Sequence, residues 1–177
     1  STATSRLYWS TIKDAASWPT NNFIDIEKDQ GIGTGMFAFG NELLCFKSYG
    51  IFKVVGETFD PSNPTYAVYP IAVPRGFKFN ANRSITEHRG LLYFLSHNQL
   101  YSYSPGSSTI QLVSDAWQND LGNVFYSTID VGDREQMQSG ISINGYLVYR
   151  GIVRSGSDAT ETFYGRGGIL DRRGKWW

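Results

Sequence analysis

The sequence predicts an all-β fold built from four-stranded antiparallel sheets, in the manner of β-propeller blades. A strand–turn–strand pattern occurs twice, in residues 43–54 and 91–103, with the two starting points 48 residues apart. Short segments rich in aromatic and β-branched residues also run along the whole chain, separated by Gly, Asn and Asp turns. A multi-strand unit that recurs about every 40–50 residues is typical of propeller blades.

Each copy of the pattern consists of an apolar strand, a short turn and a second strand that alternates aromatic and polar residues. The apolar strands are 43–47 and 91–95, and the second strands are 51–54 and 100–103. Aligned on these letters, the second copy has one extra residue in its turn. A continuous apolar run is typical of a strand covered on both faces. We therefore expect both apolar strands to lie inside a stack of sheets.

The remaining elements follow from turn signals along the chain. Gly40-Asn41, Arg89-Gly90 and Asn144-Gly145 each separate two strand patterns, and Asn-Gly is a strong hairpin signal. A short helical turn at 13–18 would be stopped by Pro19. Expected strands are 7–11, 22–27, 35–39, 43–47, 51–55, 66–71, 83–88, 91–95, 100–104, 110–113, 124–129, 138–143, 146–153, 162–170 and 175–177.

These strands group into blade pieces within one domain that spans residues 1–177. The pieces are 6–27, 35–71, 83–129 and 138–177, and a third, weaker copy of the repeat lies in the last of them. Both ends of the sequence have strand patterns, so we expect them to pair with each other, with a longer chain or with a neighbouring subunit. The prediction is therefore an incomplete propeller or a fragment of a larger one.

Composition gives no support to several function classes. Lys plus Arg equals Asp plus Glu at 16 each, so nothing in the net charge favours wrapping nucleic acid or binding an anionic membrane. No stretch approaches the roughly 18–20 apolar residues of a membrane-spanning helix. Cys45 is the one cysteine, which rules out an internal disulfide, and its apolar strand predicts a small buried side chain.

Several segments resemble a known family. They are RLYWS at 6–10, SWP at 17–19, NFIDI at 22–26, GNELLCFK at 40–47, GIFKV at 50–54, GLLYFLS at 90–96 and LYSY at 100–103. Together they are similar to the propeller-type tail and neck proteins of tailed bacteriophages, including the nozzle proteins of short-tailed phages. The resemblance is good over residues 6–113 and loose beyond, where 171–176 is similar to an outer-strand turn of propeller blades. Members of that family are usually much longer.

The resemblance implies a structural virion protein of the tail or neck, assembled in the bacterial host. Its partners would be other copies of itself or other virion proteins in a ring around a channel that conducts DNA. It implies no catalytic residue and no cofactor. Loops 60–64, 114–123 and 130–135 would then make the contacts with neighbouring subunits.

The residues themselves offer little support for an enzyme. His88 and His97 each lie beside an expected turn, where we expect both to face solvent, and neither has zinc-site spacing with Cys45. There is no Gly-x-Ser-x-Gly motif. Asp25 and Glu27 would share one face of a strand, as a glycosidase pair requires, although a solvated outer face is the simpler interpretation. We expect no enzyme, no metal and no cofactor.

Two sets of residues are candidates for binding. Trp18 and Trp117 lie in expected loops, where tryptophan can stack on sugar rings, whereas the other tryptophans would fill contacts between blades. The second set is a local basic patch in residues 150–177, which hold six basic and three acidic groups. Its arginines are Arg150, Arg154, Arg166, Arg172 and Arg173.

Three functions therefore stay open at the level of sequence. The first is the non-enzymatic assembly module of a phage tail or neck, whose basic patch would face DNA in the channel or an acidic neighbour. The second is a carbohydrate-binding or glycan-cleaving propeller, such as a receptor-binding protein or a lectin. The third is a cellular interaction propeller, which differs from the first only in its partner.

Overall fold

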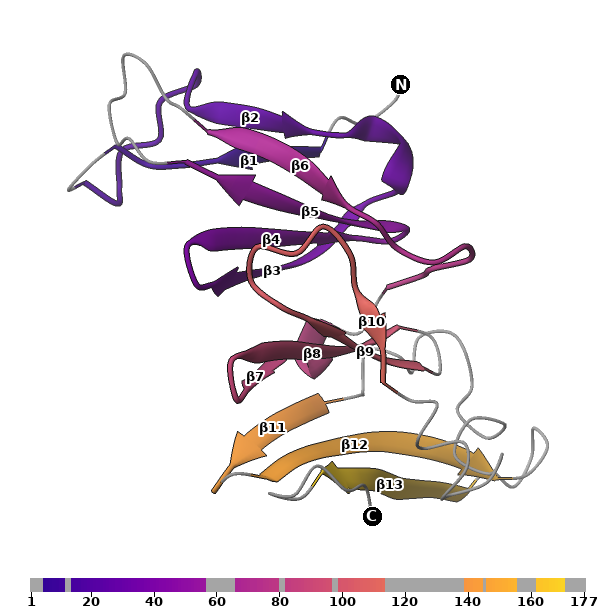
Figure 1. Cartoon of the computed structure of the whole chain (residues 1–177). Helices are drawn as coiled ribbons and strands as arrows, with labels where there is room; N and C mark the ends of the chain where they lie inside the picture. Colours follow the sequence, from indigo (N-terminus) through magenta and orange to yellow (C-terminus); the bar gives the residue numbers. More distant parts are fainter. Residues whose placement is uncertain are drawn as a thin grey trace.

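The protein is an all-β chain of antiparallel sheets in the computed structural model. The structure describes residues 5–11, 14–56, 66–79, 82–96, 99–113, 139–144, 146–155 and 162–170. Within these ranges the only helices are two short 3-10 turns, η1 (Lys28–Gln30) and η2 (Asn82–Ser84). The sheets follow one another in sequence order from the top to the bottom of Figure 1.

The described strands form four sheets. The first is a pair, β1 (Ser5–Tyr8) and β2 (Phe23–Ile26). The second is a four-stranded meander of β3 (Gly33–Phe39), β4 (Glu42–Lys47), β5 (Gly50–Val55) and β6 (Ala67–Ile71). The third is a second meander of β7 (Thr86–His88), β8 (Leu91–Ser96), β9 (Gln99–Tyr103) and β10 (Gln111–Leu112). The fourth contains β11 (Ser139–Ile143), β12 (Tyr146–Ser155) and β13 (Thr162–Leu170).

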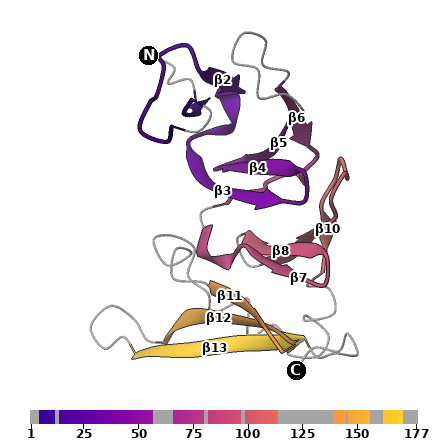
Figure 2. The same ribbon diagram turned by 90° about the vertical axis from the view of Figure 1, so that its left-hand side faces the viewer.

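The all-β prediction and the grouping of strands into antiparallel sheets are confirmed. The expected strand 83–88 is shorter than predicted, because residues 82–84 form η2 and β7 begins only at Thr86, and the expected strand 110–113 is reduced to β10. The expected strands 124–129 and 175–177 lie outside the described residues. Figure 2 shows the sheets from the side, and no pairing among the described strands closes the array into a ring.

The predicted two-residue turns form the hairpins. At the β7–β8 turn, Arg89 and Gly90 have φ angles of 52° and 75°, the positive pair that a type I′ turn requires. At the β11–β12 turn, Asn144 has φ of 50°, a conformation that asparagine tolerates better than most residues. These turns fix which residues of successive sheets are equivalent.

The register corrects the sequence alignment of the repeat by one residue. Phe39 pairs with Glu42 and His88 pairs with Leu91, so Glu42 and Leu91 occupy the same position and the offset is 49. The next turns then have equal lengths, with no extra residue in the second copy. Both apolar strands are covered on both faces, so their sequences alone do not show which residues face the preceding sheet and which face the following one. A slip of one residue exchanges the two faces.

With this alignment, successive sheets stack in the same orientation. Cys45 and Phe94 are equivalent, and each faces the sheet that precedes its own: Cys45 clusters with Ile26 of β2, and Phe94 clusters with Phe46 of β4. In the other direction, Phe46 of β4 faces the sheet that follows. Each described meander therefore places the same strand face against its predecessor.

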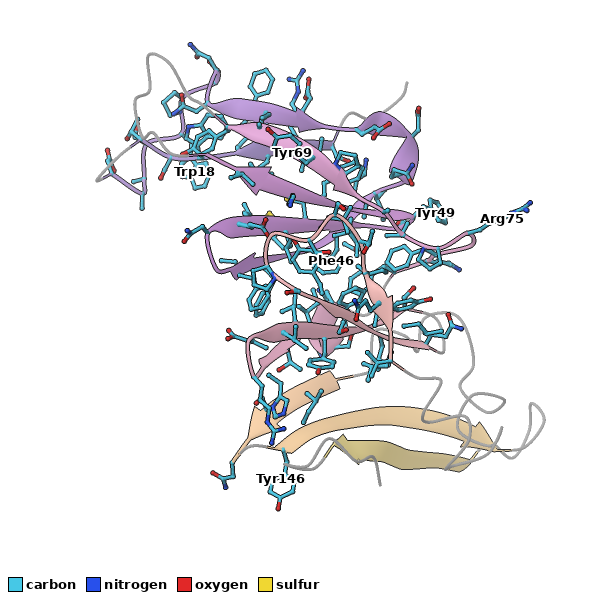
Figure 3. The ribbon with its side chains drawn as sticks, viewed as in Figure 1. Trp18, Phe46, Tyr49, Tyr69, Arg75 and Tyr146 are labelled. Atoms are coloured by element: carbon cyan, nitrogen blue, oxygen red, sulfur yellow. The ribbon has the colours of Figure 1, made fainter. Side chains whose placement is uncertain are left out.

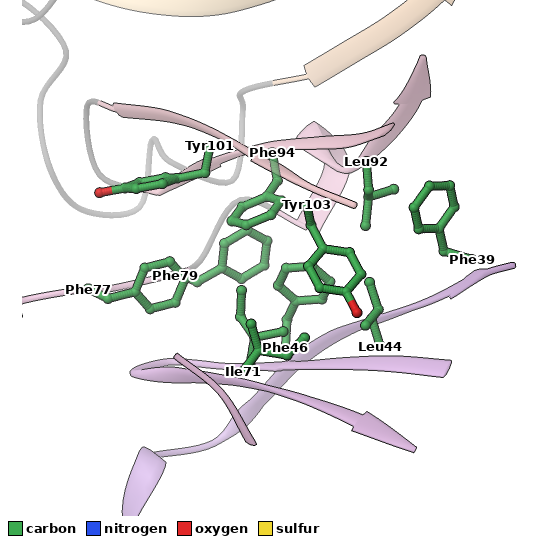
Figure 4. Close-up of a cluster of buried hydrophobic side chains, with 11 residues drawn as sticks. Phe39, Leu44, Phe46, Ile71, Phe77, Phe79, Leu92, Phe94, Tyr101 and Tyr103 are labelled. Atoms are coloured by element: carbon green, nitrogen blue, oxygen red, sulfur yellow. The ribbon is translucent and has the colours of Figure 1, made fainter. Parts of the chain in front are cut away.

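The main core fills the space between the two four-stranded sheets. The rings of Phe46, Phe79 and Phe94 meet at its centre, with centroid distances of 4.7, 5.2 and 5.9 Å. Figure 4 shows side chains from both sheets meeting there, with Phe77 and Phe79 inserted from the connection that follows β6. Its buried members are Phe39, Leu44, Phe46, Ile51, Ile71, Phe77, Phe79, Leu92, Phe94, Tyr101 and Tyr103.

A smaller core lies between β1–β2 and the opposite face of the first meander. It contains Ile26, Cys45, Phe52 and Val54. Cys45 is buried, as its strand pattern predicts, and burial raises the pKa of its thiol to about 11. The thiol is therefore protonated at neutral pH and acts as a small apolar side chain.

Candidate functional site

A polar network joins the two meanders beside their aromatic core. The Tyr103 hydroxyl donates to Glu42 Oε2 at 2.5 Å, and Lys53 Nζ lies 3.2 Å from Glu42 Oε1. Lys53 also donates to the backbone oxygen of Ser107 at 3.0 Å, in the turn that follows β9. The Lys53 and Glu42 side chains are only 15% and 10% exposed. We call these residues the Glu42 network.

The ionisation of the Glu42 network is set by its surroundings. Burial acts to raise the pKa of Glu42, but hydrogen bonds from Tyr103, the Gly106 backbone and Lys53 outweigh it and lower the pKa. Burial, reinforced by the bond to Glu42, raises the pKa of Tyr103. A carboxylate therefore accepts from a neutral phenol at neutral pH. The Tyr103–Glu42 and Lys53–Ser107 hydrogen bonds both cross the contact between the two sheets.

His88 forms the side-chain link between β7 and β11. Its Nδ1 lies 2.9 Å from the Ser142 hydroxyl, and its ring lies 6.2 Å from that of Tyr93. His88 is 2% exposed, and its Nε2 is buried with no hydrogen-bond partner among the described residues. Burial, followed by the charge of Arg89, lowers the pKa of His88.

The prediction that His88 faces solvent is therefore wrong. His88 is the last residue of β7, and strand alternation turns it toward the next sheet together with Thr86. Only the two residues that follow it form the exposed turn. His97, the other histidine, lies outside the described residues.

An aromatic cleft separates β1–β2 from one end of the first meander. Trp9 and Tyr66 meet at a centroid distance of 5.0 Å and an angle of 60°, and the Tyr66 ring lies so close to Gly56 that a Cβ there would approach it to 2.3 Å. The cavity measures about 250 Å³. It is lined by Leu7, Tyr8, Trp9, Ile24, Asn41, Leu43, Val54, Gly56 and Tyr66, none of which is charged.

A second opening lies between β1 and the β3–β4 hairpin. Its volume is about 260 Å³, and its walls include Arg6, Leu7, Met36 and Cys45. Lys47 also lines this opening: it is 1% exposed, and its Nζ donates to the backbone oxygen of Glu27. Burial lowers the pKa of Lys47, and the nearby acidic groups Glu27 and Asp29 oppose that effect.

A third opening, of about 540 Å³, lies beside the connection between β6 and η2. The backbone N–H of Phe77 donates to the Pro74 oxygen at 3.1 Å, and Gly76 has φ of 81°, which makes a tight turn with Arg75 at its tip. Arg75 projects away from the sheets on the right of Figure 3.

Of the two predicted tryptophans, Trp18 lies in the described part of the chain and Trp117 does not. Trp18 is 59% exposed, and its indole N–H donates to the Ala15 oxygen at 2.8 Å, which fixes the ring in its loop. Trp18 does not line the aromatic cleft, and Figure 3 places it on the opposite side of the molecule from Arg75. Sequence analysis missed Tyr66, which has no distinguishing neighbour in the sequence.

The predicted basic residues are only partly described. In the β12–β13 register Arg166 pairs with Gly151, whereas Arg150 pairs with Gly167 and Arg154 with Phe163. Arg172 and Arg173 lie outside the described residues, and a single basic patch stays a prediction.

Asp25 and Glu27, the carboxylate pair considered for glycan cleavage, do not share a strand face as that function requires. Asp25 Oδ1 lies 2.8 Å from Arg6 Nε across the β1–β2 pair, with both side chains more than 40% exposed. Glu27 lies beyond the end of β2. The arrangement therefore agrees with the solvated outer face that the sequence favoured.

No family model matches this chain, and no curated protein matches its sequence. Among the residues that the structure describes, no three His, Cys, Asp or Glu side chains gather in a way that would hold a metal ion. Likewise, no helix in the described part has the length and apolar character to cross a membrane.

Proposed function

We propose that this chain is a non-enzymatic assembly module whose sheets act as the blades of a propeller-like array and pack against neighbouring subunits. The observation that supports this most is the stacking of two successive meanders in the same orientation, with equivalent residues on equivalent faces. Radial repetition of such units is how propellers are built. The polar groups of the Glu42 network and the His88 link serve contacts between sheets.

Exposed apolar residues on and beside β1 and β3 favour an assembly role. Ile32 is 72% exposed, Met36 62% and Tyr8 46%. Ile32 lies directly before β3, and Met36 lies on it. Exposed apolar side chains of this size are candidates for a protein interface.

The resemblance to phage tail and neck proteins suggests the setting: a ring of subunits in a virion, with DNA in its channel. In that setting Arg150, Arg154, Arg166, Arg172 and Arg173 would meet DNA or an acidic neighbour. A DNA contact would weaken steeply with rising salt. Equal binding of duplex DNA at about 50 and 200 mM salt would exclude this role for the arginines.

Self-association is the direct test of the assembly proposal. We expect sedimentation velocity of the purified chain to show concentration-dependent oligomers, and electron microscopy of these oligomers to show rings. Substituting Met36→Ser and Tyr8→Ser should shift the distribution toward monomer, whereas Tyr69→Ser, at an exposed site on β6, serves as the matched control. A chain that stays monomeric at every concentration and binds no structural partner would overturn the proposal.

The aromatic cleft favours a second candidate, binding of a neutral saccharide. Trp9 and Tyr66 offer ring surfaces, and no lining residue carries a charge. A glycan array combined with a hydrolysis screen tests this function. Binding that is lost in Tyr66→Ala but kept in Trp18→Ala would assign it to the cleft. If no glycan on the array binds, saccharide binding is excluded.

A further inference from the structure

The face of the first meander that looks toward β1–β2 is covered unevenly. Phe52 and Val54 on β5 are 3% and 6% exposed beneath the strand pair. Met36 on β3, which pairs with Cys45 on this same face, is 62% exposed. The opening of about 260 Å³ lies between Met36 and β1. The strand pair β1–β2 therefore covers β5 and leaves Met36 on β3 exposed to solvent.

The equivalent face of the second meander is fully covered over its apolar strand. Leu92 and Phe94 on β8 are both 0% exposed. The side chains that cover them include Phe39 of β3 and Phe46 of β4, in the same cluster. At that junction the β3–β4 hairpin is thus part of what lies against the next sheet.

The strand pair β1–β2 corresponds to the third and fourth strands of the repeat. β2 is followed by η1 and then β3, just as β6 is followed by η2 and then β7. In each full meander the third strand is paired on both sides: β5 lies between β4 and β6, and β9 lies between β8 and β10. Among the described strands, β1 pairs with β2 alone. The position of a second strand beside β1 is therefore open.

The backbone of β1 is set up to accept such a strand. The N–H of Trp9 donates to the Asn22 oxygen at 3.1 Å. Leu7, two residues earlier and opposite Ile24, therefore also directs its N–H and C=O groups toward β2. In an antiparallel pair the alternate residues turn their N–H and C=O groups outward. These residues are Arg6 and Tyr8, and an edge of this kind is a template for a further strand.

We propose that the open edge of β1 receives a β-hairpin from a neighbouring subunit, which pairs with Arg6 and Tyr8 and covers Met36. This inference rests on the proposed assembly function and names the surface that carries it. The hairpin that fits has the chemistry of β3–β4: an antiparallel pair whose inner face carries side chains such as Leu44 and Phe46. Its two strands occupy the first and second positions of a complete meander.

The probe for this surface is a synthetic peptide of residues 33–47 with serine in place of Cys45. An isolated hairpin is marginally stable, so docking would be coupled to its folding and the affinity would be modest. We expect saturable binding to the full chain, slower hydrogen exchange at the amides of Arg6 and Tyr8, and a shift of the Met36 methyl resonance. A scrambled peptide of the same composition is the control.

Arg6→Pro provides the decisive variant. It removes one outward N–H from β1 and no hydrogen bond to β2, a position where an edge strand tolerates proline. Arg6→Ala is its matched control, because it loses the same ion pair with Asp25 but keeps the N–H. We expect Arg6→Pro to weaken peptide binding at least tenfold relative to Arg6→Ala, with equal circular dichroism spectra. Equal affinities, or no binding to the parent chain, would overturn the inference.

Failure of this inference is distinguishable from failure of the assembly function. If the parent chain forms oligomers in sedimentation but binds no hairpin peptide, the assembly function stands and the β1 edge is excluded as its surface. If the peptide binds as expected while the chain stays monomeric, the edge is a strand acceptor and self-association is excluded.

Discussion

Removing the hydroxyl of Tyr103 should loosen the contact between the two meanders. The substitution Tyr103→Phe keeps the ring, which is 1% exposed and packs 6.4 Å from Phe39, so the apolar packing stays in place. What is lost is the hydroxyl's 2.5 Å hydrogen bond to the carboxylate of Glu42 and its longer contact of 3.3 Å with the Ser107 backbone oxygen. The effect therefore reports on the polar network alone.

The magnitude follows from the charge and burial of the acceptor. A hydrogen bond to a charged group contributes about 1.5–3 kcal/mol to stability. Glu42 keeps Lys53 as a partner at 3.2 Å after the substitution, which places the expected loss near the lower end, about 1.5–2 kcal/mol. At roughly 2–4 °C per kcal/mol for a domain of this size, the melting temperature should fall by about 3–8 °C.

Urea unfolding followed by tryptophan fluorescence measures this loss. Tyr69→Phe is the matched control, because Tyr69 is 51% exposed, and it should leave the unfolding midpoint unchanged. A double-mutant cycle with Glu42→Gln isolates the pair, and we expect a coupling energy of about 1 kcal/mol or more. A loss below about 0.5 kcal/mol, or additive effects in the cycle, would refute the assignment of Tyr103 and Glu42 to the inter-sheet contact.

Three further perturbations test other contacts. Phe94→Ala should cost about 3–5 kcal/mol in urea unfolding, because the ring is fully buried between the sheets. Gly31→Ala should cost at least about 1 kcal/mol, since Gly31 has φ of 79° and a Cβ would lie 2.8 Å from that of Ser48. The folded state holds the pKa of His88 below its usual 6.5, so it binds fewer protons than the unfolded state, and stability should decline as the pH falls below about 6.5. Unfolding midpoints at several pH values measure this decline, which His88→Gln should reduce.

Each of these perturbations has an outcome that contradicts it. An unchanged melting temperature for Phe94→Ala would remove β8 from the core. A stable Gly31→Ala variant would mean that the turn before β3 relaxes without cost. If His88→Gln has the same acid sensitivity as the parent chain, protonation of His88 is not what weakens the link to Ser142.

Local signals sufficed for the strands and hairpins. Gly40-Asn41 and Arg89-Gly90 mark turns whose backbone angles depend on one or two residues, and the apolar runs of β4 and β8 mark strands covered on both faces. These features depend on neighbours in sequence, which is why sequence analysis recovers them.

The features that sequence analysis missed depend on contacts between distant residues. The repeat has an offset of 49 residues, whereas sequence analysis predicted 48. The alignment was ambiguous because β4 and β8 are apolar on both faces, and the pairing of Phe39 with Glu42 in the structure resolves it. Burial of His88 depends on a β11 residue 54 positions away. The bond between Tyr103 and Glu42 spans 61 positions, and neither residue lies in a recognisable motif.

The shared orientation of the sheets gives the array a polarity. The first and last described sheets therefore present different faces to their surroundings. If the first sheet of one array meets the last sheet of another, the association is heterologous, head to tail: it gives a closed ring if the rotation between subunits divides a full circle, and an open filament if it does not. The angle between neighbouring sheets would thereby decide whether the assembly stops growing.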